Sequence, residues 1–391
     1  MKTKRHFLFP AIFCQLIFLI NIHGLCAREA ALVQTRKGWG YLCKDSTWLI
    51  SPQFENLEMN KTTFEAVTPK SSIGSFSEGM VRYSNRSIWG YYNDLGERSI
   101  PEKFDGARDF SDSLAAVKKI NKWGYIDKKG SWVIQPLYAD AYNFSNGLAP
   151  VKVGKRWGYI DKTGKWFIEP KFEDAFSFRE NLAAVKLEGE WGYINLSGAM
   201  VIKPSFELAF NFKNGLARIR TEEGYGYIDT VGRIIVKPVF ISVAHFSESF
   251  VRVRVNDFCV YVNQKGQVIG KNKFRYAENF SDGAARVRNE EKWGFIDTTT
   301  EWLLKPAFDG AGDFVNGIAR VKNGDAWMFI NKKGEHLFNK QVFEKAEDFN
   351  NGLAPAKTNT GWGYLKENGE WYISPTFEAC RDFQETSETL R

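Results

Sequence analysis

Short runs of aromatic and β-branched residues recur along this chain, each bounded by polar turn residues. The runs Trp-Gly-Tyr-Ile-Asp (123–127) and Ser-Trp-Val-Ile-Gln (131–135) are one example, joined by Lys-Lys-Gly. Such residues favour strands. An Asp or Asn side chain three residues before a glycine is typical of a hairpin turn, where the glycine adopts a positive φ. The pattern therefore predicts a β-hairpin at 123–135.

A third run at 148–153 ends just before the next Trp, so each unit is expected to be a three-stranded antiparallel meander. A link of about a dozen residues then leads to the next unit, and each link carries an aromatic residue at the same position. The links are therefore expected to be packed. Most begin with a proline: Pro52, Pro136, Pro170, Pro204, Pro238, Pro306 and Pro375.

The unit occurs ten times at a nearly fixed spacing. The leading positions are Trp39, Trp89, Trp123, Trp157, Trp191, Tyr225, Cys259, Trp293, Trp327 and Trp362. From Trp89 to Trp327 every step is 34 residues, and the first step of 50 indicates an insertion around 55–75. A fixed period of this size indicates a repeat architecture. Residues 27–391 are therefore predicted to form a single array of ten repeats.

Apolar side chains point to both faces of each predicted hairpin, because neighbouring residues on a strand alternate in direction. One small sheet cannot bury both faces alone, so neighbouring units must cover them. The array is predicted to be all-β and propeller-like. An open β superhelix or solenoid is the alternative. The first and last units carry the standard motif rather than polar caps, which favours closure.

Closure would bring Cys43 of the first unit near Cys380 of the last, and a disulfide between them is one hypothesis. The remaining cysteines do not form a metal-binding spacing.

The first 26 residues differ from the array. Basic residues precede an apolar run at 7–20, and small residues follow it, which is typical of a signal peptide. Export to the periplasm, the outer surface or the medium is therefore expected. A lipoprotein anchored through Cys26 is a less favoured alternative. No other apolar stretch reaches the length of a membrane span.

Composition and chemistry give little support to other classes of function. The net charge of +7 is spread along the chain, which does not favour nucleic-acid binding. His245 and His336 have no partners at the spacing of a metal or catalytic site. No nucleophile–base pair or paired carboxylates are recognisable. The chain is therefore not expected to be an enzyme or to need a cofactor.

Candidate ligand-facing residues come from the variable positions. The second Trp of the unit varies between repeats, so Trp132, Trp166 and Trp302 are expected to be more exposed than the leading Trp. Exposed rings could stack on sugars. The hairpin turns carry lysines that could meet an anionic partner or form an ordinary solvated edge. These are Lys128, Lys129, Lys332 and Lys333.

The repeated motif resembles that of the WG-repeat family, also called KWG repeats. The signature Trp-Gly-Tyr/Phe-Ile-Asp, followed by Gly, an apolar triplet, Pro and Phe, is clearest from Trp123, Trp157, Trp191 and Trp293. It has eroded in the unit at Trp327, where Met328 takes the place of the Gly. The family is often found in exported or envelope proteins of bacteria. The resemblance implies β-rich repeats and a binding or scaffolding role, with no catalytic residues to transfer.

The sequence as a whole predicts an exported, non-catalytic scaffold that binds protein partners at the cell envelope. A lectin-like repeat protein that binds carbohydrate is the alternative.

Overall fold

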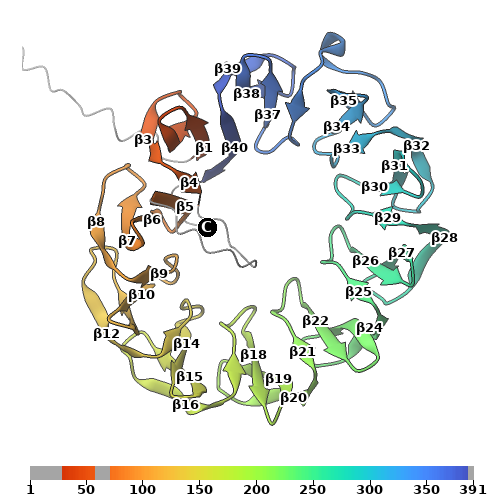
Figure 1. The fold of residues 1–391 in the computed structure, drawn as a ribbon. Helices are drawn as coiled ribbons and strands as arrows, with labels where there is room; N and C mark the ends of the chain where they lie inside the picture. The colour runs from red at the N-terminus through yellow and green to blue at the C-terminus, as the bar shows by residue number, and fades with distance from the viewer. Residues whose placement is uncertain (1–28, 58–70, 386–391) are drawn as a thin grey trace, which may run out of the picture.

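The chain forms a closed ring of ten small antiparallel sheets. The computed structural model describes residues 29–57 and 71–385. The sheets stand around a central opening like the blades of a propeller (Figure 1). The all-β prediction and the choice of a closed array over an open superhelix are both confirmed. The predicted signal peptide at 1–26, Cys26 and most of the insertion lie outside the described residues.

We number the blades 1 to 10 in chain order. The strands of blades 1 to 5 are β1 (Glu29–Thr35), β2 (Gly38–Cys43), β3 (Trp48–Phe54); β4 (Asn56–Leu57), β5 (Ser71–Ser77), β6 (Met80–Asn85), β7 (Ile88–Asn93), β8 (Ile100–Phe104); β9 (Gly106–Ala107), β10 (Ala115–Lys119), β11 (Lys122–Ile126), β12 (Trp132–Tyr138); β13 (Asp140–Ala141), β14 (Leu148–Val153), β15 (Arg156–Asp161), β16 (Trp166–Phe172); β17 (Asp174–Ala175), β18 (Leu182–Leu187), β19 (Glu190–Asn195) and β20 (Met200–Phe206).

The strands of blades 6 to 10 are β21 (Leu208–Ala209), β22 (Leu216–Thr221), β23 (Gly224–Asp229), β24 (Ile234–Phe240); β25 (Ser242–Val243), β26 (Phe250–Val255), β27 (Phe258–Asn263), β28 (Val268–Phe274); β29 (Tyr276–Ala277), β30 (Ala284–Arg288), β31 (Trp293–Asp297), β32 (Trp302–Phe308); β33 (Gly310–Ala311), β34 (Ile318–Asn323), β35 (Ala326–Asn331); β36 (Lys345–Ala346), β37 (Leu353–Thr358), β38 (Gly361–Lys366) and β39 (Trp371–Phe377). A 3-10 turn, η2 (Phe338–Lys340), follows β35, and β40 (Ala379–Glu385) ends the described chain.

Most blades have four strands, so the predicted count of three is corrected. The extra strand is short and comes from the link: in blade 4, Asp140 pairs with Lys152 and Ala141 with Val151. A two-residue strand leaves no alternating pattern in the sequence, because alternation needs at least four residues to be visible. The packed links that the sequence predicts thus become the innermost strand of each sheet.

The Gly of the motif is required by a bulge in the outermost strand. In blade 4, Trp157 pairs with Phe172 and Tyr159 with Ile168, and the register shifts between these pairs. A Cβ on Gly158 would lie 2.5 Å from the carbonyl oxygen of Ile168 and 2.8 Å from the nitrogen of Pro170. Only a glycine leaves room for this backbone. The proline fits the bulge because it has no N–H that the sheet must satisfy.

Blade 9 lacks both the Gly and the Pro of the motif. Met328 replaces the Gly, Lys340 replaces the Pro, and the sheet keeps only three strands. The 3-10 turn and an isolated bridge between Trp327 and Phe343 take the place of the fourth strand. Blade 7 also lacks both residues, with Val260 and Asn272 in their places, yet it keeps four strands. The two substitutions alone therefore do not remove the fourth strand.

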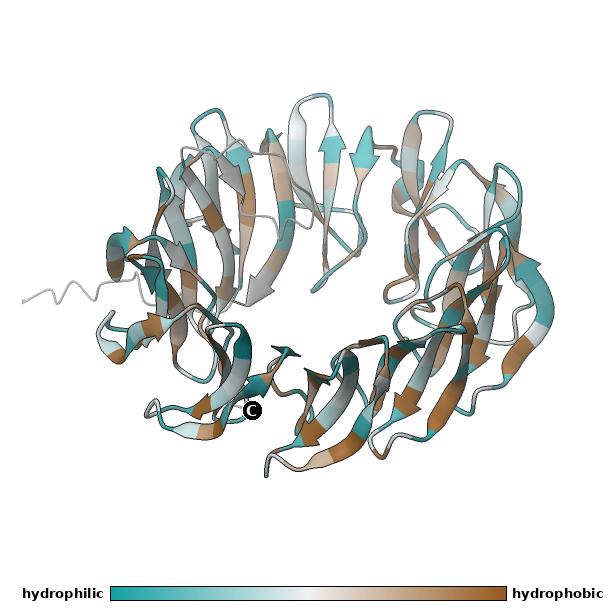
Figure 2. Ribbon diagram, turned by 60° about the horizontal axis from the view of Figure 1, so that its bottom comes forward, coloured by the Kyte–Doolittle hydropathy of each residue, from teal (hydrophilic) through white to brown (hydrophobic). Residues whose placement is uncertain are grey.

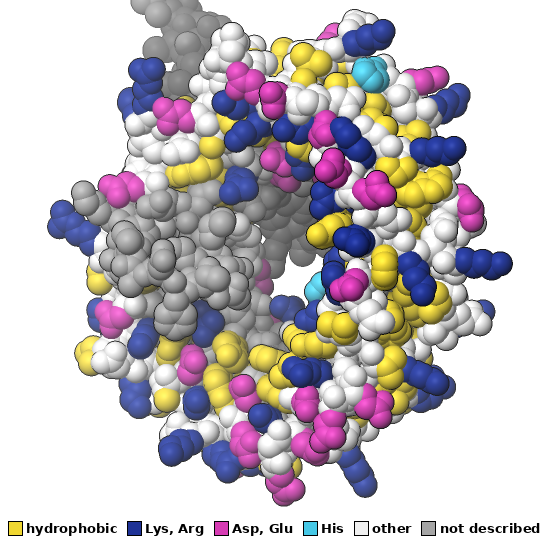
Figure 3. All heavy atoms as spheres, turned by 45° about the vertical axis from the view of Figure 1, so that its right-hand side comes forward, with side chains coloured by type: hydrophobic (Ala, Val, Ile, Leu, Met, Phe, Trp, Pro, Cys, Tyr) yellow, Lys and Arg dark blue, Asp and Glu magenta, His cyan; other side chains and the backbone are white. Residues whose placement is uncertain are grey.

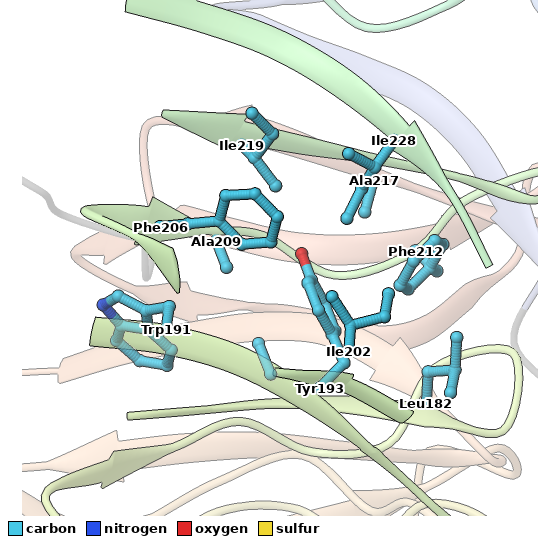
Figure 4. Packing of buried hydrophobic residues seen from close by; sticks show 11 residues of the cluster. Leu182, Trp191, Tyr193, Ile202, Phe206, Ala209, Phe212, Ala217, Ile219 and Ile228 are labelled. Carbon is cyan, nitrogen blue, oxygen red and sulfur yellow. The ribbon is translucent and has the colours of Figure 1, made fainter. Parts of the chain in front are cut away.

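The hydrophobic core is divided into clusters that lie between neighbouring blades. Figure 4 shows one of them, in which Trp191, Tyr193 and Ile202 of blade 5 meet Phe212 and Ile219 around blade 6. Figure 2 shows the apolar stretches along the strands and more hydrophilic residues at the turns. Fully burying one such side chain contributes roughly 1.5–3 kcal/mol. Each blade therefore depends on both neighbours for its stability.

The Tyr of the motif is buried and hydrogen-bonded. In seven blades its hydroxyl donates to the carbonyl of the residue 17 positions later; the donors are Tyr91, Tyr125, Tyr159, Tyr193, Tyr227, Tyr261 and Tyr364. Burial raises the pKa of Tyr227 to about 12 and that of Tyr125 well above its ordinary value. The bond satisfies the one polar atom of an otherwise apolar ring and ties the link to the sheet.

The ring is closed by β40, which pairs antiparallel with β1 and becomes the innermost strand of blade 1. Phe383 of β40 is 2% exposed and packs 4.8 Å from the ring of Tyr364 in blade 10. Blade 1 therefore contains both the first and the last strand of the described chain, side by side in Figure 1.

The predicted disulfide between Cys43 and Cys380 is wrong. Cys380 is a free thiol, whereas Cys43 is disulfide-bonded. The two residues flank β1 from opposite sides, with Cys43 opposite Ala30 and Cys380 opposite Val33. Two strand spacings of roughly 4.8 Å each separate them, more than the ~7 Å between Cα atoms that a disulfide tolerates. Closure makes the two units neighbours without bringing these thiols together.

The insertion is predicted around 55–75, and the structure describes both ends of this range. Strand β5 (71–77) belongs to blade 2, and β4 pairs with it in parallel as a fifth strand. Residues 58–70, between β4 and β5, lie outside the described residues. The repeat period places Leu57 and Ile73 at the same position of the link. The short link strand is therefore present twice, once on each side of the insertion.

We predict that Gly158→Ala lowers the stability of the ring by about 1–3 kcal/mol, because the new Cβ overlaps backbone atoms that cannot move independently. Urea unfolding followed by Trp fluorescence measures the change. Lys155→Ala, at an exposed turn of the same blade, is the control and should stay within about 0.5 kcal/mol of the wild type. Equal midpoints for Gly158→Ala and the wild type would contradict the role given to the bulge.

We predict that Phe383→Ala costs about 3–5 kcal/mol, because it removes a fully buried ring from the closure. Phe167→Ala is the control, since this ring is 41% exposed and its loss should matter far less. Thermal unfolding of the three proteins side by side checks this. A small effect of Phe383→Ala would mean that β40 is not needed to hold the ring closed.

Candidate functional site

The predicted tryptophans lie on the outermost strands of different blades, at or near the first residue of each. Trp166 and Trp302 are each 36% exposed, which confirms that prediction for these two, whereas Trp132 is less exposed and partly buried. The structure does not bring the three together, because they belong to blades 4, 8 and 3. They therefore do not form a single binding site.

These rings also have a structural role that the sequence did not reveal. Each packs edge to face against an aromatic ring at the end of the preceding blade. The centroid distances are 5.7 Å for Trp132 and Phe104, 6.1 Å for Trp166 and Tyr138, and 5.9 Å for Trp302 and Phe274. Each tryptophan ring thus forms part of the contact between two neighbouring blades.

The predicted lysines divide into two kinds. Lys128 forms an ion pair of 3.8 Å with Glu78, and Lys332 one of 3.1 Å with Asp282, in each case across a boundary between blades. Lys129 and Lys333 are exposed to solvent. The two pairs sit in blades 3 and 9, so they do not form one anionic docking surface. Exposed ion pairs of this kind contribute little to stability.

A large cleft lies at the seam where blade 10 meets blade 1. Its volume is about 940 Å³. Trp48, Pro52 and Phe377 supply apolar walls, while Arg36 and Lys357 supply positive charge. Trp48 is 38% exposed and packs 6.5 Å from Phe377, so this tryptophan contacts the seam and also presents a free surface. An aromatic anchor with polar groups around it is the usual anatomy of a binding patch.

A second set of charged groups lies near the central opening, where Figure 3 shows basic and acidic side chains along the inner wall. We call the five arginines at one repeat position on the next-to-innermost strands the arginine row. They are Arg82, Arg218, Arg252, Arg286 and Arg320.

The arginine row clamps neighbouring blades together. In blade 8, Arg286 donates through Nη1 to the carbonyl of Ala311 in the next blade and through Nε to Asp313 at 2.8 Å. Its guanidinium also lies 5.6 Å from the ring of Trp293. Arg320 repeats this arrangement with Ala346 and with Asp348 at 2.8 Å. The sequence signal was present, because four of these arginines recur at a 34-residue spacing, but the spacing does not reveal their partners.

Other chemistry is sparse in the part of the chain that the structure describes. No group of three or more His, Cys, Asp or Glu side chains there is arranged to hold a metal ion. His336 is exposed in blade 9, and His245 lines a cavity beside the arginine row. Across residues 29–57 and 71–385, no helix is long and apolar enough to span a membrane.

Comparison with known proteins identifies the repeats. The sequence profile described as WG containing repeat matches nine tandem segments, at residues 89–123, 123–157, 157–191, 191–224, 225–257, 261–293, 293–326, 327–359 and 362–385. No curated protein matches the chain in sequence.

Solved structures give only distant likenesses. A eukaryotic initiation factor covers 93% of this chain and 100% of its own at 8% identity, with a TM-score of 0.48. Hsv2p of Kluyveromyces lactis covers 57% of this chain and 92% of its own at 13% identity and a TM-score of 0.35. The dihydro-heme d1 dehydrogenase NirN covers 71% of this chain and 72% of its own, at 11% identity and a TM-score of 0.38. At these scores they contribute nothing to the functional argument.

We predict that Trp166 and Tyr138 are energetically coupled by about 0.5–1.5 kcal/mol, the usual range for an edge-to-face ring pair. A double-mutant cycle with Trp166→Ala and Tyr138→Ala measures the coupling by urea unfolding. The same cycle between Trp166→Ala and Val268→Ala, an exposed position in blade 7, should be additive. Additivity in both cycles would show that the ring contact contributes nothing.

Proposed function

This chain belongs to the family of WG-containing repeat proteins, and from that premise we propose that it is an exported, non-catalytic scaffold that binds a protein partner. The seam cleft between blades 10 and 1 is the binding surface of this proposal. The observation that carries it is that one cleft at the seam combines a partly exposed tryptophan, Trp48, with basic side chains.

The closed ring suits such a role. Every blade is held on both sides by its neighbours, so the seam cleft is lined by preordered elements rather than by free loops. Preordered surfaces lose less conformational freedom when a partner binds, which favours affinity. Arg36, Lys37 and Lys357 against Glu378 give the cleft a net positive charge. An acidic or neutral segment of a partner fits that charge better than a basic one.

Export is the second part of the proposal. It rests on the basic, apolar and small-residue order of residues 1–26. The periplasm, the outer surface and the medium all fit this order, and partners are sought there first.

A lectin-like function is the second candidate, because Trp166 and Trp302 each present part of a ring to solvent. Their separation into different blades counts against a lectin-like function, since each tryptophan would have to bind sugar alone. A glycan array probed with the wild type, Trp132→Ala and Trp166→Ala tests it. Binding that disappears in the variants while the fold persists would favour carbohydrate over protein.

The main test is capture of partners from an envelope extract by the mature chain. We expect a protein to be retained by the wild type and lost with Trp48→Ala. Trp166→Ala is the matched control, because it removes a ring at the same repeat position and with the same edge-to-face contact, but outside the seam cleft. Capture that survives Trp48→Ala, or that is lost equally in both variants, would contradict a binding role for the seam.

A further inference from the structure

One member of the arginine row lacks the acidic partner that the others have. Arg82 pairs with Asp109 at 3.1 Å, Arg252 with Glu278 at 3.8 Å and Arg286 with Asp313 at 2.8 Å. No carboxylate of the described residues forms an ion pair with Arg218 of blade 6. Its Nε is buried without a hydrogen-bond partner, as is that of Arg252, so it is the missing carboxylate that sets Arg218 apart. A buried donor without a partner is costly, so it requires an explanation.

The difference is a substitution at one repeat position. Asp109 and Asp313 lie 27 residues after their arginines, and the residue 27 positions after Arg218 is His245. Arg252 has Asn279 at this position and pairs with the preceding Glu278, whereas Ala244 precedes His245. The rest of the clamp is retained, because Arg218 still donates through Nη1 to the carbonyl of Val243 in blade 7 at 3.3 Å. Its guanidinium also stacks 3.8 Å from the ring of Phe210. The arginine is therefore held in place as in the other blades, without the carboxylate.

A cavity opens where that carboxylate would lie. It has a volume of about 530 Å³ and is lined by Arg218, His245, Lys213 and Arg179 on its polar side and by Phe210 and Tyr227 on its apolar side. Burial, followed by the positive charges of Arg218 and Lys213, lowers the pKa of His245. Another cavity, near Asp348 and Asp382, is acidic and lies across the ring.

The acidic residue in this wall does not neutralise the arginine. Glu180 accepts hydrogen bonds from the backbone N–H groups of Asn214 and Gly215, at 2.5 and 2.8 Å. Both oxygens of this carboxylate thus bind backbone N–H groups in the turn of blade 6 and not Arg218. Three cationic side chains and a histidine remain around the cavity, against this one carboxylate.

We propose that the cavity around Arg218 and His245 is a binding site for a carboxylate group. The ligand takes the place that Asp313 occupies beside Arg286 in blade 8, with Phe210 holding the guanidinium plane and Lys213 adding positive charge. A charge-assisted bond between a guanidinium and a carboxylate is among the stronger polar contacts in proteins. This site is separate from the seam cleft, so it does not depend on the proposed function.

The carboxylate could belong to a small acid or to an acidic segment of a protein, and the test separates these sources. The full chain, labelled with ¹³C at its four histidines, is titrated with glutarate in one arm and with a hexaglutamate peptide in the other. His245→Gln identifies the signal of His245. We expect a saturable shift of that signal and a rise in the pKa of His245, because a bound carboxylate offsets the neighbouring positive charges. The arm that saturates at lower concentration indicates the source.

The decisive variant is His245→Asp, which restores within the chain a carboxylate at the repeat position from which Asp313 pairs with Arg286. We expect it to weaken the binding of glutarate and of the peptide at least tenfold, as measured by calorimetry. The midpoint of urea unfolding should not fall. His336→Asp is the matched control, because it makes the same change at the exposed histidine of blade 9 and should leave binding intact. Arg218→Met should also abolish binding, although it removes part of a clamp between blades, and its unfolding midpoint is measured alongside.

Three results would overturn the proposal. One is the absence of a shift at His245 with either carboxylate. Another is an equal response to sodium chloride at matched ionic strength, which would indicate only general screening. The third is undiminished binding to His245→Asp. Each can be reached whether or not the envelope extract yields a partner for the seam cleft.

Discussion

Burial of aromatic and aliphatic side chains between neighbouring blades is the interaction on which the whole structure depends. A single blade has apolar residues on both faces and too few of them to be stable alone. Each blade therefore needs two neighbours, and a finite row would leave one bare face at each end. The pairing of β40 with β1 removes both ends by joining them. Closure is thus the direct consequence of an apolar pattern that continues without caps from the first unit to the last.

The sequence predicts this architecture well where a feature repeats and poorly where it depends on a single contact. The 34-residue period, the hairpins and the closed array all follow from patterns present in nearly every unit. The short link strands were missed because two residues such as Asp140 and Ala141 show no alternation. The pairing of Cys43 with Cys380 failed because neighbouring units do not imply neighbouring side chains, and β1 lies between the two positions.

In the candidate sites too, repeated features could be predicted from the sequence and single contacts could not. Exposure of Trp166 and Trp302 could be predicted from the variability of their repeat position, but their packing on the preceding blade could not, since it depends on how blades are rotated against each other. The seam cleft could not be predicted at all, because it combines residues from the two ends of the chain. In a repeat protein the most informative positions are the exceptions. Blade 9, where Met328 replaces the Gly, lacks its fourth strand, and His245 stands where Arg82 and Arg286 have an aspartate.

The shared construction of blade 1 also governs the order in which the protein can reach its final form. Strands β1 to β3 are made first, yet their sheet lacks its innermost member until β40 has been synthesised. During that interval β1 has an unpaired edge, and the side chains that later meet Phe383 are uncovered. An unpaired edge of this kind can recruit the wrong strand, including one from another copy of the chain. A chain whose synthesis is incomplete therefore cannot complete its ring.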